Sequence, residues 1–140
     1  MAPHDRYGKT VMRRAAGSRF QSSGPELIVD LGAGAPARID GTVASEVAVE
    51  IESRVSKQIR GAILDLILHK LHKKLLVLMP VHMSNPEKAA AQCRSILGRF
   101  MEADKFRVVL LTGSGHNHRE EADAALVREA LSQLGIESSA

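Results

Sequence analysis

The order of segments in this 140-residue chain predicts an α/β protein of the α+β type, with a mixed β-sheet flanked by helices on both faces. Two observations lead to this fold class. Residues 26–53 hold short extended runs separated by glycine-rich turns, whereas residues 56–134 alternate apolar strands with segments of helical period. Short turns join antiparallel strands and helices join parallel ones, so one sheet with both kinds of pairing is expected.

Length and composition fit one globular domain. Of the 140 residues, 44% are apolar and 25% charged, which is enough for a single hydrophobic core. Residues 1–24 are polar and basic, and we expect them to form an N-terminal segment with a short helix over Lys9–Ala16, ended by Gly17. The Ser-Ser-Gly-Pro cluster at 22–25 is a break, so the single domain is expected to span residues 25–140.

Extended segments come first in this domain. Their β-branched and apolar residues are separated by glycine-containing breaks at 32–36 and 41–45. The three expected runs are Glu26–Leu31, Ala37–Asp40 and Glu46–Ser53.

From residue 56 the apolar period becomes helical. Ser56 is a candidate N-cap for the first helix, and the pair Asn85-Pro86 is a strong start for the second. Short, continuous apolar runs between the helices predict buried strands. The expected elements are a helix from Ser56 to about Leu71, a strand over Leu75–Met79, a helix from Ser84 to about Met101, a strand over Phe106–Leu111 and a helix over Glu120–Leu134.

Three acidic residues converge in the expected sheet. Successive side chains of a strand point to opposite faces, so Glu50 and Glu52 share one face. Neighbouring like charges are unfavourable unless something positive lies between them. Asp40, at the end of the preceding run, is a third acid. Three converging carboxylates predict a site for Mg²⁺ or Mn²⁺, which prefer oxygen ligands.

Basic residues follow these acids directly. Arg54, Lys57 and Arg60 surround the start of the next helix, where they suit phosphate. Lys and Arg outnumber Asp and Glu in the first half of the chain, although the net charge of the whole chain is only +3. A basic surface around an acidic site is expected of a protein that acts on a phosphate backbone.

Other features exclude several classes of protein. Only 3% of the residues are aromatic, which argues against a base-stacking platform for single-stranded nucleic acid or RNA. The single Cys93 excludes an internal disulfide and a four-cysteine zinc site, and indicates a reduced thiol. The sequence shows neither a membrane span nor the apolar part of a secretion signal, so we expect a cytoplasmic protein without a membrane partner.

The element order and the placing of the acids resemble the restriction-endonuclease-like superfamily, also called PD-(D/E)xK nucleases. The resemblance covers roughly residues 5–111 and depends on Asp40, on Glu50 and Glu52, and on the pair Lys57-Gln58. It implies a restriction-endonuclease-like mixed sheet flanked by helices, and an endonuclease that uses Mg²⁺ or Mn²⁺ to hydrolyse phosphodiester bonds of DNA. Asp40 matches the first metal-binding acid of that family, and Glu50 matches the second.

Glu52 is where this chain departs from the family. The family motif usually has lysine at this position, where it positions or activates the attacking water. The resemblance therefore assigns Asp40, Glu50 and Glu52 to the metal, and Lys57 from the next helix to the basic role. The residues expected to contact DNA, at phosphates that carry no sequence information, are Arg54, Gln58 and Arg60.

Two other interpretations stay open. Because Glu52 replaces the lysine, the chain fits an inactive nuclease fold that binds DNA or protein. Alternatively, Ile28–Ala35 resembles the glycine-rich motif of S-adenosylmethionine-dependent methyltransferases, with Glu50 as the acid that binds the ribose. Against this, Pro36 and the polar residues 37–45 make a poor helix, and 140 residues hardly supply an open sheet of about seven strands. The glycines equally fit a plain hairpin.

A partner subunit or a homodimer is expected, because no recognition subdomain is visible. Leu64, Leu68 and Leu71 add apolar surface to a second side of the helix that starts at residue 56. This surface fits the core and a homodimer seam equally well. His69 and His72 are expected at a helix end rather than on zinc.

Overall fold

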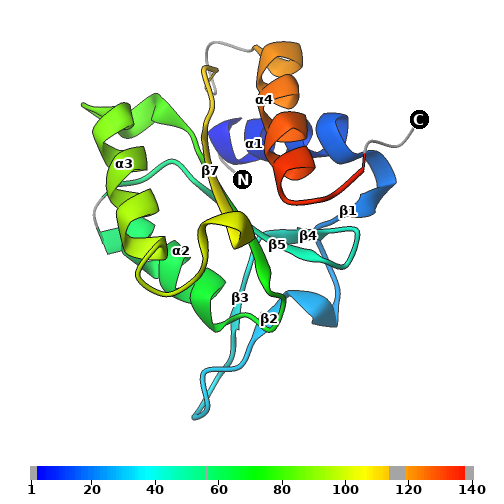
Figure 1. Cartoon of the computed structure of the whole chain (residues 1–140), viewed down its shortest axis with the longest axis vertical. Helices are drawn as coiled ribbons and strands as arrows, with labels where there is room; N and C mark the ends of the chain where they lie inside the picture. The colour runs from blue at the N-terminus through cyan, green and yellow to red at the C-terminus, as the bar shows by residue number, and fades with distance from the viewer. Residues whose placement is uncertain (1–2, 56, 114–118, 138–140) are drawn as a thin grey trace.

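A five-stranded sheet forms the centre of the molecule in the computed structural model, which describes residues 3–55, 57–113 and 119–137 (Figure 1). Its strands are β1 (Phe20–Gln21), β4 (Gly41–Val43), β5 (Val47–Glu52), β6 (Lys73–Leu78) and β7 (Phe106–Leu110), in the spatial order β1-β4-β5-β6-β7. β1 and β5 each pair antiparallel with β4, whereas β5, β6 and β7 run parallel to one another. The sheet is therefore mixed, as the sequence predicts.

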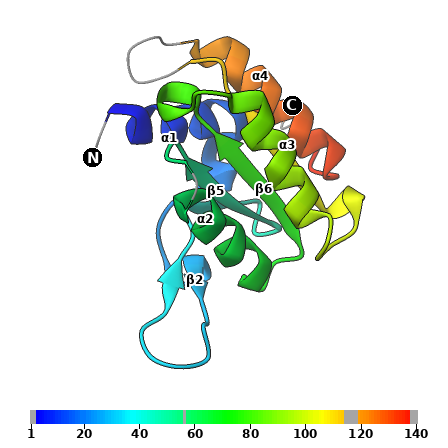
Figure 2. The same ribbon diagram turned by 90° about the vertical axis from the view of Figure 1, so that its left-hand side faces the viewer.

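Helices cover both faces of the sheet, which confirms the expected α/β architecture. They are α1 (Pro3–Ala16), α2 (Lys57–Leu68), α3 (Pro86–Leu97) and α4 (Glu120–Gln133). α1 and α4 pack on one face of the sheet, and α2 and α3 on the other (Figures 1 and 2). Short 3-10 helices lie at Gly17–Arg19, Pro25–Leu27, Pro80–His82 and Ala103–Lys105. None of the helices among the described residues is both long and apolar enough to cross a membrane.

Helix α1 packs directly on the sheet and on α4. It starts at Pro3, several residues before the expected Lys9, and ends just before Gly17, whose φ of +61° favours glycine. A Cβ at Gly8 would lie 2.6 Å from the Ile51 Cγ2 atom, so glycine allows α1 to approach β5 closely. The next residue, Lys9, is thereby carried to the strand that bears the predicted acids. Within residues 6–16 of α1, the buried side chains are Tyr7, Val11, Met12 and Ala16.

Two of the three expected extended runs form a small sheet of their own. β2 (Ile28–Val29) and β3 (Ala37–Arg38) pair antiparallel as a hairpin that projects from the body of the protein (Figure 2). The main sheet instead gains β4 from residues 41–45, where the sequence predicts only a connector. That expectation was wrong.

The residues around β4 explain the error. The turn between β4 and β5 contains no glycine, yet Ala44 and Ser45 both have a φ of +54°. Gly41, which resembles a turn residue, lies within the strand. Glycine is needed at this position because a Cβ there would clash with the ring of Phe20 on β1. The glycine therefore serves the packing of two strands, and the local sequence pattern does not reveal this role.

A buried carboxylate joins α1, α4 and the end of β7. Asp123 is fully buried and accepts hydrogen bonds from the Tyr7 hydroxyl, from the N–H and hydroxyl of Thr112, and from the Gly113 N–H. Burial opposes ionisation of Asp123, but these hydrogen bonds outweigh it and hold the pKa of the carboxyl below its usual value. Burial, followed by the bond to Asp123, raises the pKa of Tyr7 to about 12.

The end of α2 confirms the helix-end position expected for His69. Its ring is buried, with Nε2 2.6 Å from the Glu26 carbonyl oxygen and Nδ1 accepting from the Leu71 N–H. Lys74 is also buried and donates from Nζ to the His69 carbonyl over 2.7 Å. Burial lowers the pKa of Lys74 to about 8. Ser56, the candidate N-cap of this helix, lies outside the described residues.

The second apolar side of α2 is solvent-exposed in the single chain. Leu64 is 53% exposed and Leu68 is 47% exposed, whereas Leu71 packs partly against the core. The two leucines on α2 are therefore not core residues. A homodimer seam at this surface stays a prediction.

Candidate active site

Asp40 and Glu50 lie side by side near the centre of the sheet. The β4–β5 register pairs Gly41 with Val49, and one further step along both strands places Asp40 opposite Glu50. The Asp40 N–H donates to Glu50 Oε1 over 2.8 Å, and the Ile51 N–H donates to Asp40 Oδ2 over 2.7 Å. β5 is an interior strand and Glu50 is only 7% exposed, so Glu50 is not a solvated acid at a sheet edge.

Burial and mutual repulsion shift the pKa values of this acid pair. Burial, followed by the charge of Asp40, raises the pKa of Glu50 to about 9. Burial also raises the pKa of Asp40, although the hydrogen bonds from Ile51 and from the Glu50 carboxyl oppose this. With a pKa of about 9, Glu50 keeps its proton at neutral pH. On α2, burial and the charge of Asp40 raise the pKa of Asp65 as well.

Glu52 is held by the chain that follows β5. Its Oε2 accepts from the Ser53 N–H at 3.0 Å and from the Arg54 N–H at 2.9 Å. The Arg54 guanidinium also forms a bidentate pair, with Nε 3.0 Å from Oε2 and Nη2 3.2 Å from Oε1 of Glu52. Glu52 remains close enough to Asp40 for its charge to raise the pKa of Asp40. The predicted third acid is therefore in the site but is paired with Arg54.

A cavity of about 470 Å³, here called the acid cavity, contains these groups. Its lining consists of Lys9, Arg38, Asp40, Glu50, Ile51, Glu52, Arg54, Gln58, Gly61, Ala62 and Asp65. The site residues predicted from the sequence that line it are Asp40, Glu50, Glu52, Arg54 and Gln58. Lys57, the predicted basic residue, is exposed and is not part of the lining. Arg60 is not part of it either.

Sequence reasoning missed three charged residues of the acid cavity. Lys9 comes from α1, and its charge lowers the pKa of Asp40. Arg38 comes from β3 of the small hairpin. Asp65 lies seven residues after Gln58, which is two helical turns and hence the same face of α2. Asp65 could have been found from the sequence, because it is an acid inside an otherwise apolar helical run. No local sequence pattern identifies Lys9 or Arg38.

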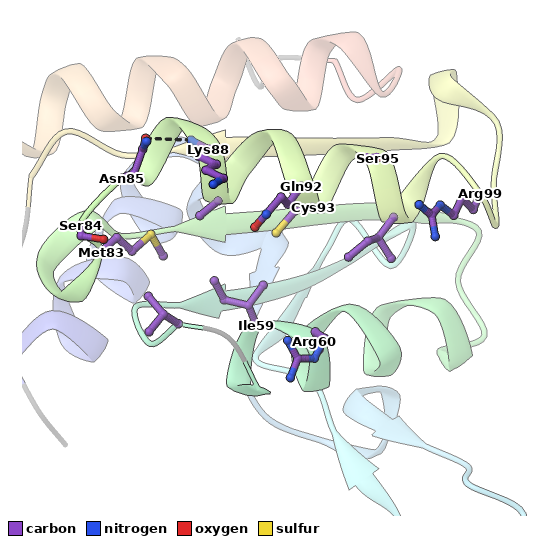
Figure 3. Close-up of a pocket in the computed structure, with 13 residues that line it drawn as sticks. Ile59, Arg60, Met83, Ser84, Asn85, Lys88, Gln92, Cys93, Ser95 and Arg99 are labelled. Atoms are coloured by element: carbon purple, nitrogen blue, oxygen red, sulfur yellow. Dashed lines mark hydrogen bonds between the residues drawn. The ribbon is translucent and has the colours of Figure 1, made fainter.

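Arg60 lines a second hollow of about 700 Å³ between α2 and α3, here called the α2–α3 groove (Figure 3). Lys88 on α3 and Arg99, in the turn that follows α3, line the same hollow. The lining consists of Val55, Ile59, Arg60, Met83, Ser84, Asn85, Lys88, Ala89, Gln92, Cys93, Ser95, Ile96 and Arg99. Asn85 caps α3, since its side chain accepts from the Lys88 N–H.

The acid cavity has the donor chemistry of a divalent-metal site but is not a preformed cage. Within residues 3–55, 57–113 and 119–137, no three His, Cys, Asp or Glu side chains are arranged to hold a metal ion as they stand. The carboxylates of Asp40, Glu50 and Glu52 nevertheless share one cavity, and carboxylate oxygens suit Mg²⁺ and Mn²⁺. Metal binding here would have to displace the proton on Glu50 and loosen Glu52 from Arg54.

The glycine-rich segment that resembles a methyltransferase motif is the loop of the projecting hairpin. Residues 30–36 are exposed and connect β2 to β3. The Asp30 carboxylate accepts from the Gly32 N–H over 2.8 Å, which is a local turn contact. A strand, and not a helix, follows this loop. The plain hairpin among the open interpretations is therefore the one that this segment adopts.

Comparison of the chain with protein-family models, with curated proteins and with solved structures gives no match. The mixed sheet with helices on both faces is shown by the structure itself. Any kinship with the restriction-endonuclease-like superfamily, in contrast, is a proposal that depends on the residues of the acid cavity.

Proposed function

We propose that this protein is a nuclease of the restriction-endonuclease-like kind, which uses a divalent metal to hydrolyse phosphodiester bonds of DNA. The observation that carries the proposal is the Asp40–Glu50 pair, in which half-buried Asp40, directly before β4, bonds to buried Glu50 on β5 in a cavity that Lys9 and Arg54 also line. Burial, followed by repulsion from Asp40, raises the Glu50 pKa to about 9, and such an acid pair is costly in a purely structural strand. A cation between them would offset this cost.

Asp40 and Glu50, with Glu52, are the residues that would hold Mg²⁺ or Mn²⁺. When bound, such a metal lowers the pKa of a water molecule and offsets negative charge on the phosphate. The pair is positioned for this role before binding, because each carboxyl already accepts a backbone N–H of the other's strand. Asp65, whose pKa responds to the charge of Asp40, adds a fourth carboxylate to the same cavity.

Lys9 supplies the positive charge that the family motif usually takes from the position of Glu52. It lines the acid cavity and acts electrostatically on Asp40, whereas Lys57 is exposed and outside the lining. A lysine in this place would stabilise the negative charge that develops on the phosphate. Arg54, Arg38 and Gln58 would hold the neighbouring phosphates.

A second candidate function is an inactive nuclease fold that binds DNA or protein. The bidentate pair of Glu52 with Arg54 favours it, since this pair occupies one predicted metal ligand and one predicted phosphate ligand at the same time. A nuclease must break this pair during turnover, whereas a binding module keeps it.

The two candidates are separated by a cleavage assay with labelled duplex, branched and single-stranded DNA, in the presence of Mg²⁺, Mn²⁺ or EDTA. We expect metal-dependent cleavage that Asp40→Asn and Glu50→Gln each abolish, while DNA binding in EDTA persists. Glu52→Gln should reduce the rate by about a hundredfold. Glu129→Gln, at an exposed acid of α4, is the matched control. Cleavage that survives Asp40→Asn and Glu50→Gln would contradict the nuclease, and binding without any cleavage would favour the inactive module.

A further inference from the structure

The acid cavity and the α2–α3 groove lie on either side of the first turn of α2. Arg54 and Gln58 line the acid cavity, and the residues that follow them in the chain, Val55 and Ile59, line the groove (Figure 3). Lys57 is exposed on the turn between the two hollows. A linear ligand seated at Asp40 and Glu50 can therefore pass over a single helical turn into the groove.

The charge of the groove is entirely positive. Arg60, Lys88 and Arg99 line it, and no Asp or Glu is part of the lining. Within the described part of the chain, these three side chains form no ion pair, whereas Arg14 and Arg128 on the other face of the sheet both pair with Glu121. Three exposed cations around a hollow that no acid lines suit an anionic ligand.

The size and floor of the groove restrict which anionic ligand it accepts. A volume of about 700 Å³ falls in the range of small-molecule sites, which is room for about one or two nucleotides of a single strand. The lining includes the aliphatic side chains of Val55, Ile59 and Ile96, and Gln92 adds an amide. Such aliphatic side chains can cover sugars and base faces, although the chain lacks the aromatic residues of a base-stacking platform.

We propose that the α2–α3 groove binds an unpaired nucleic-acid strand, and hence that the substrate carries a single-stranded segment beside the bond that the acid cavity cuts. This inference rests on the proposed nuclease function and names the structure of its substrate. Arg60, Lys88 and Arg99 bind consecutive phosphates of the unpaired strand, and Lys57 binds the phosphate that crosses the first turn of α2.

Binding measured without metal tests the groove separately from cleavage. Fluorescence anisotropy in EDTA compares a blunt DNA duplex with the same duplex carrying a single-stranded tail. We expect the protein to bind the tailed duplex about tenfold more tightly. The variant R60Q/K88Q/R99Q should lose this preference and reduce the slope of log affinity against log salt by about two. The matched control R13Q/K70Q/R119Q removes the same charge outside the groove lining, and should retain the preference.

A second readout locates the bound strand without any variant. In NMR spectra, a short single-stranded oligonucleotide should shift the backbone amides of Lys88 and Gln92 on α3 and of its N-cap Asn85, and leave those of α4 unchanged. If the nuclease proposal alone is wrong, cleavage is absent while the tail preference and these shifts persist. Equal affinity for blunt and tailed duplex, equal losses in both triple variants, or tighter binding of polyglutamate than of the tailed duplex would each overturn the assignment of the groove.

Discussion

The backbone N–H of Asp40 donates to the Glu50 carboxyl over 2.8 Å, and the N–H of Ile51, directly after Glu50, donates to the Asp40 carboxyl over 2.7 Å. Each carboxyl thus accepts a hydrogen bond from the backbone of the opposite side of the β4–β5 pair. Because the bonding is reciprocal, both carboxyls are fixed by the sheet and not by flexible side-chain contacts. A site built in this way is organised before any ligand arrives.

The raised pKa of Glu50 predicts how stability depends on pH in the metal-free protein. The folded pKa of about 9 exceeds the ordinary value of 4.5, so folding takes up a proton between these two pH values. The contribution of Glu50 to stability is therefore fully present below pH 4.5 and is lost as the pH rises toward 9. In urea unfolding, the free energy of unfolding of Glu50→Gln relative to the wild type should rise with pH, by up to about 1.4 kcal/mol per pH unit. A difference that does not change with pH would contradict this.

Metal binding should have the opposite pH dependence. A divalent cation binds the ionised carboxylates, so it must displace the proton on Glu50, whose pKa is about 9. The affinity for Mn²⁺, measured by calorimetry, should therefore rise from pH 6 to pH 9, with proton release at the lower pH. Saturating Mn²⁺ should also raise the melting temperature, and Asp40→Asn should abolish the rise. An unchanged melting curve in millimolar Mn²⁺ would contradict metal binding in the acid cavity.

Lys9 and Lys57 form a natural pair of test and control. Lys9 lines the acid cavity and Lys57 is exposed outside it. Lys9→Gln should lower the cleavage rate by about a hundredfold with little change in DNA affinity, because it removes charge stabilisation in the transition state. Lys57→Gln should instead leave the rate nearly unchanged and flatten the salt dependence of binding by about one unit. A loss of rate in Lys57→Gln but not in Lys9→Gln would assign the basic role to Lys57, as the sequence predicts.

Asp123 should make the protein sensitive to acid. Its pKa is depressed in the folded state, so its contribution to stability is present above the unfolded pKa of about 3.9 and is lost as the pH falls through the lower folded value. Asp123→Asn should cost about 3 kcal/mol at pH 7, because Tyr7, Thr112 and Gly113 lose a buried charged acceptor. This cost should shrink below pH 4. The exposed Asp104→Asn should stay within about 0.5 kcal/mol throughout.

Gly8 and Gly61 should respond to alanine with opposite signs. A Cβ at Gly8 would lie 2.6 Å from Ile51 Cγ2, so Gly8→Ala should destabilise the fold by about 1–3 kcal/mol and displace Lys9 from the acid cavity. A Cβ at Gly61, in α2, meets no atom within 4 Å. Gly61→Ala should therefore stabilise the protein by roughly 0.5–1 kcal/mol, since alanine is the better helix former. Thermal unfolding of the two variants measures both effects, and equal shifts would contradict the close approach of α1 to β5.

Local pattern determined the elements whose signal lies within one segment. The helix α3 begins where Asn85 and Pro86 predict it, β7 follows the predicted apolar run closely, and β6 overlaps its predicted run but starts two residues earlier, at Lys73. Strand alternation also placed Glu50 and Glu52 on one face of β5, opposite Val49. Each of these features depends on neighbours in the chain, namely a cap, a helical period or the two-residue repeat of a strand.

What depends on residues far apart in the chain was decided only by the tertiary structure. Lys9 and Arg38 reach the acid cavity because α1 packs on β5 and because the projecting hairpin folds beside α2, and neither arrangement leaves a local pattern. β4 was hidden for the same reason, since Gly41 is required by the ring of Phe20 on another strand. The sequence by itself determined that acids and bases would alternate around residues 40–60. Only the packing of α1 and α2 on the sheet decided which of those charges face one another, because burial and pairing energies depend on distance in space and not on separation along the chain.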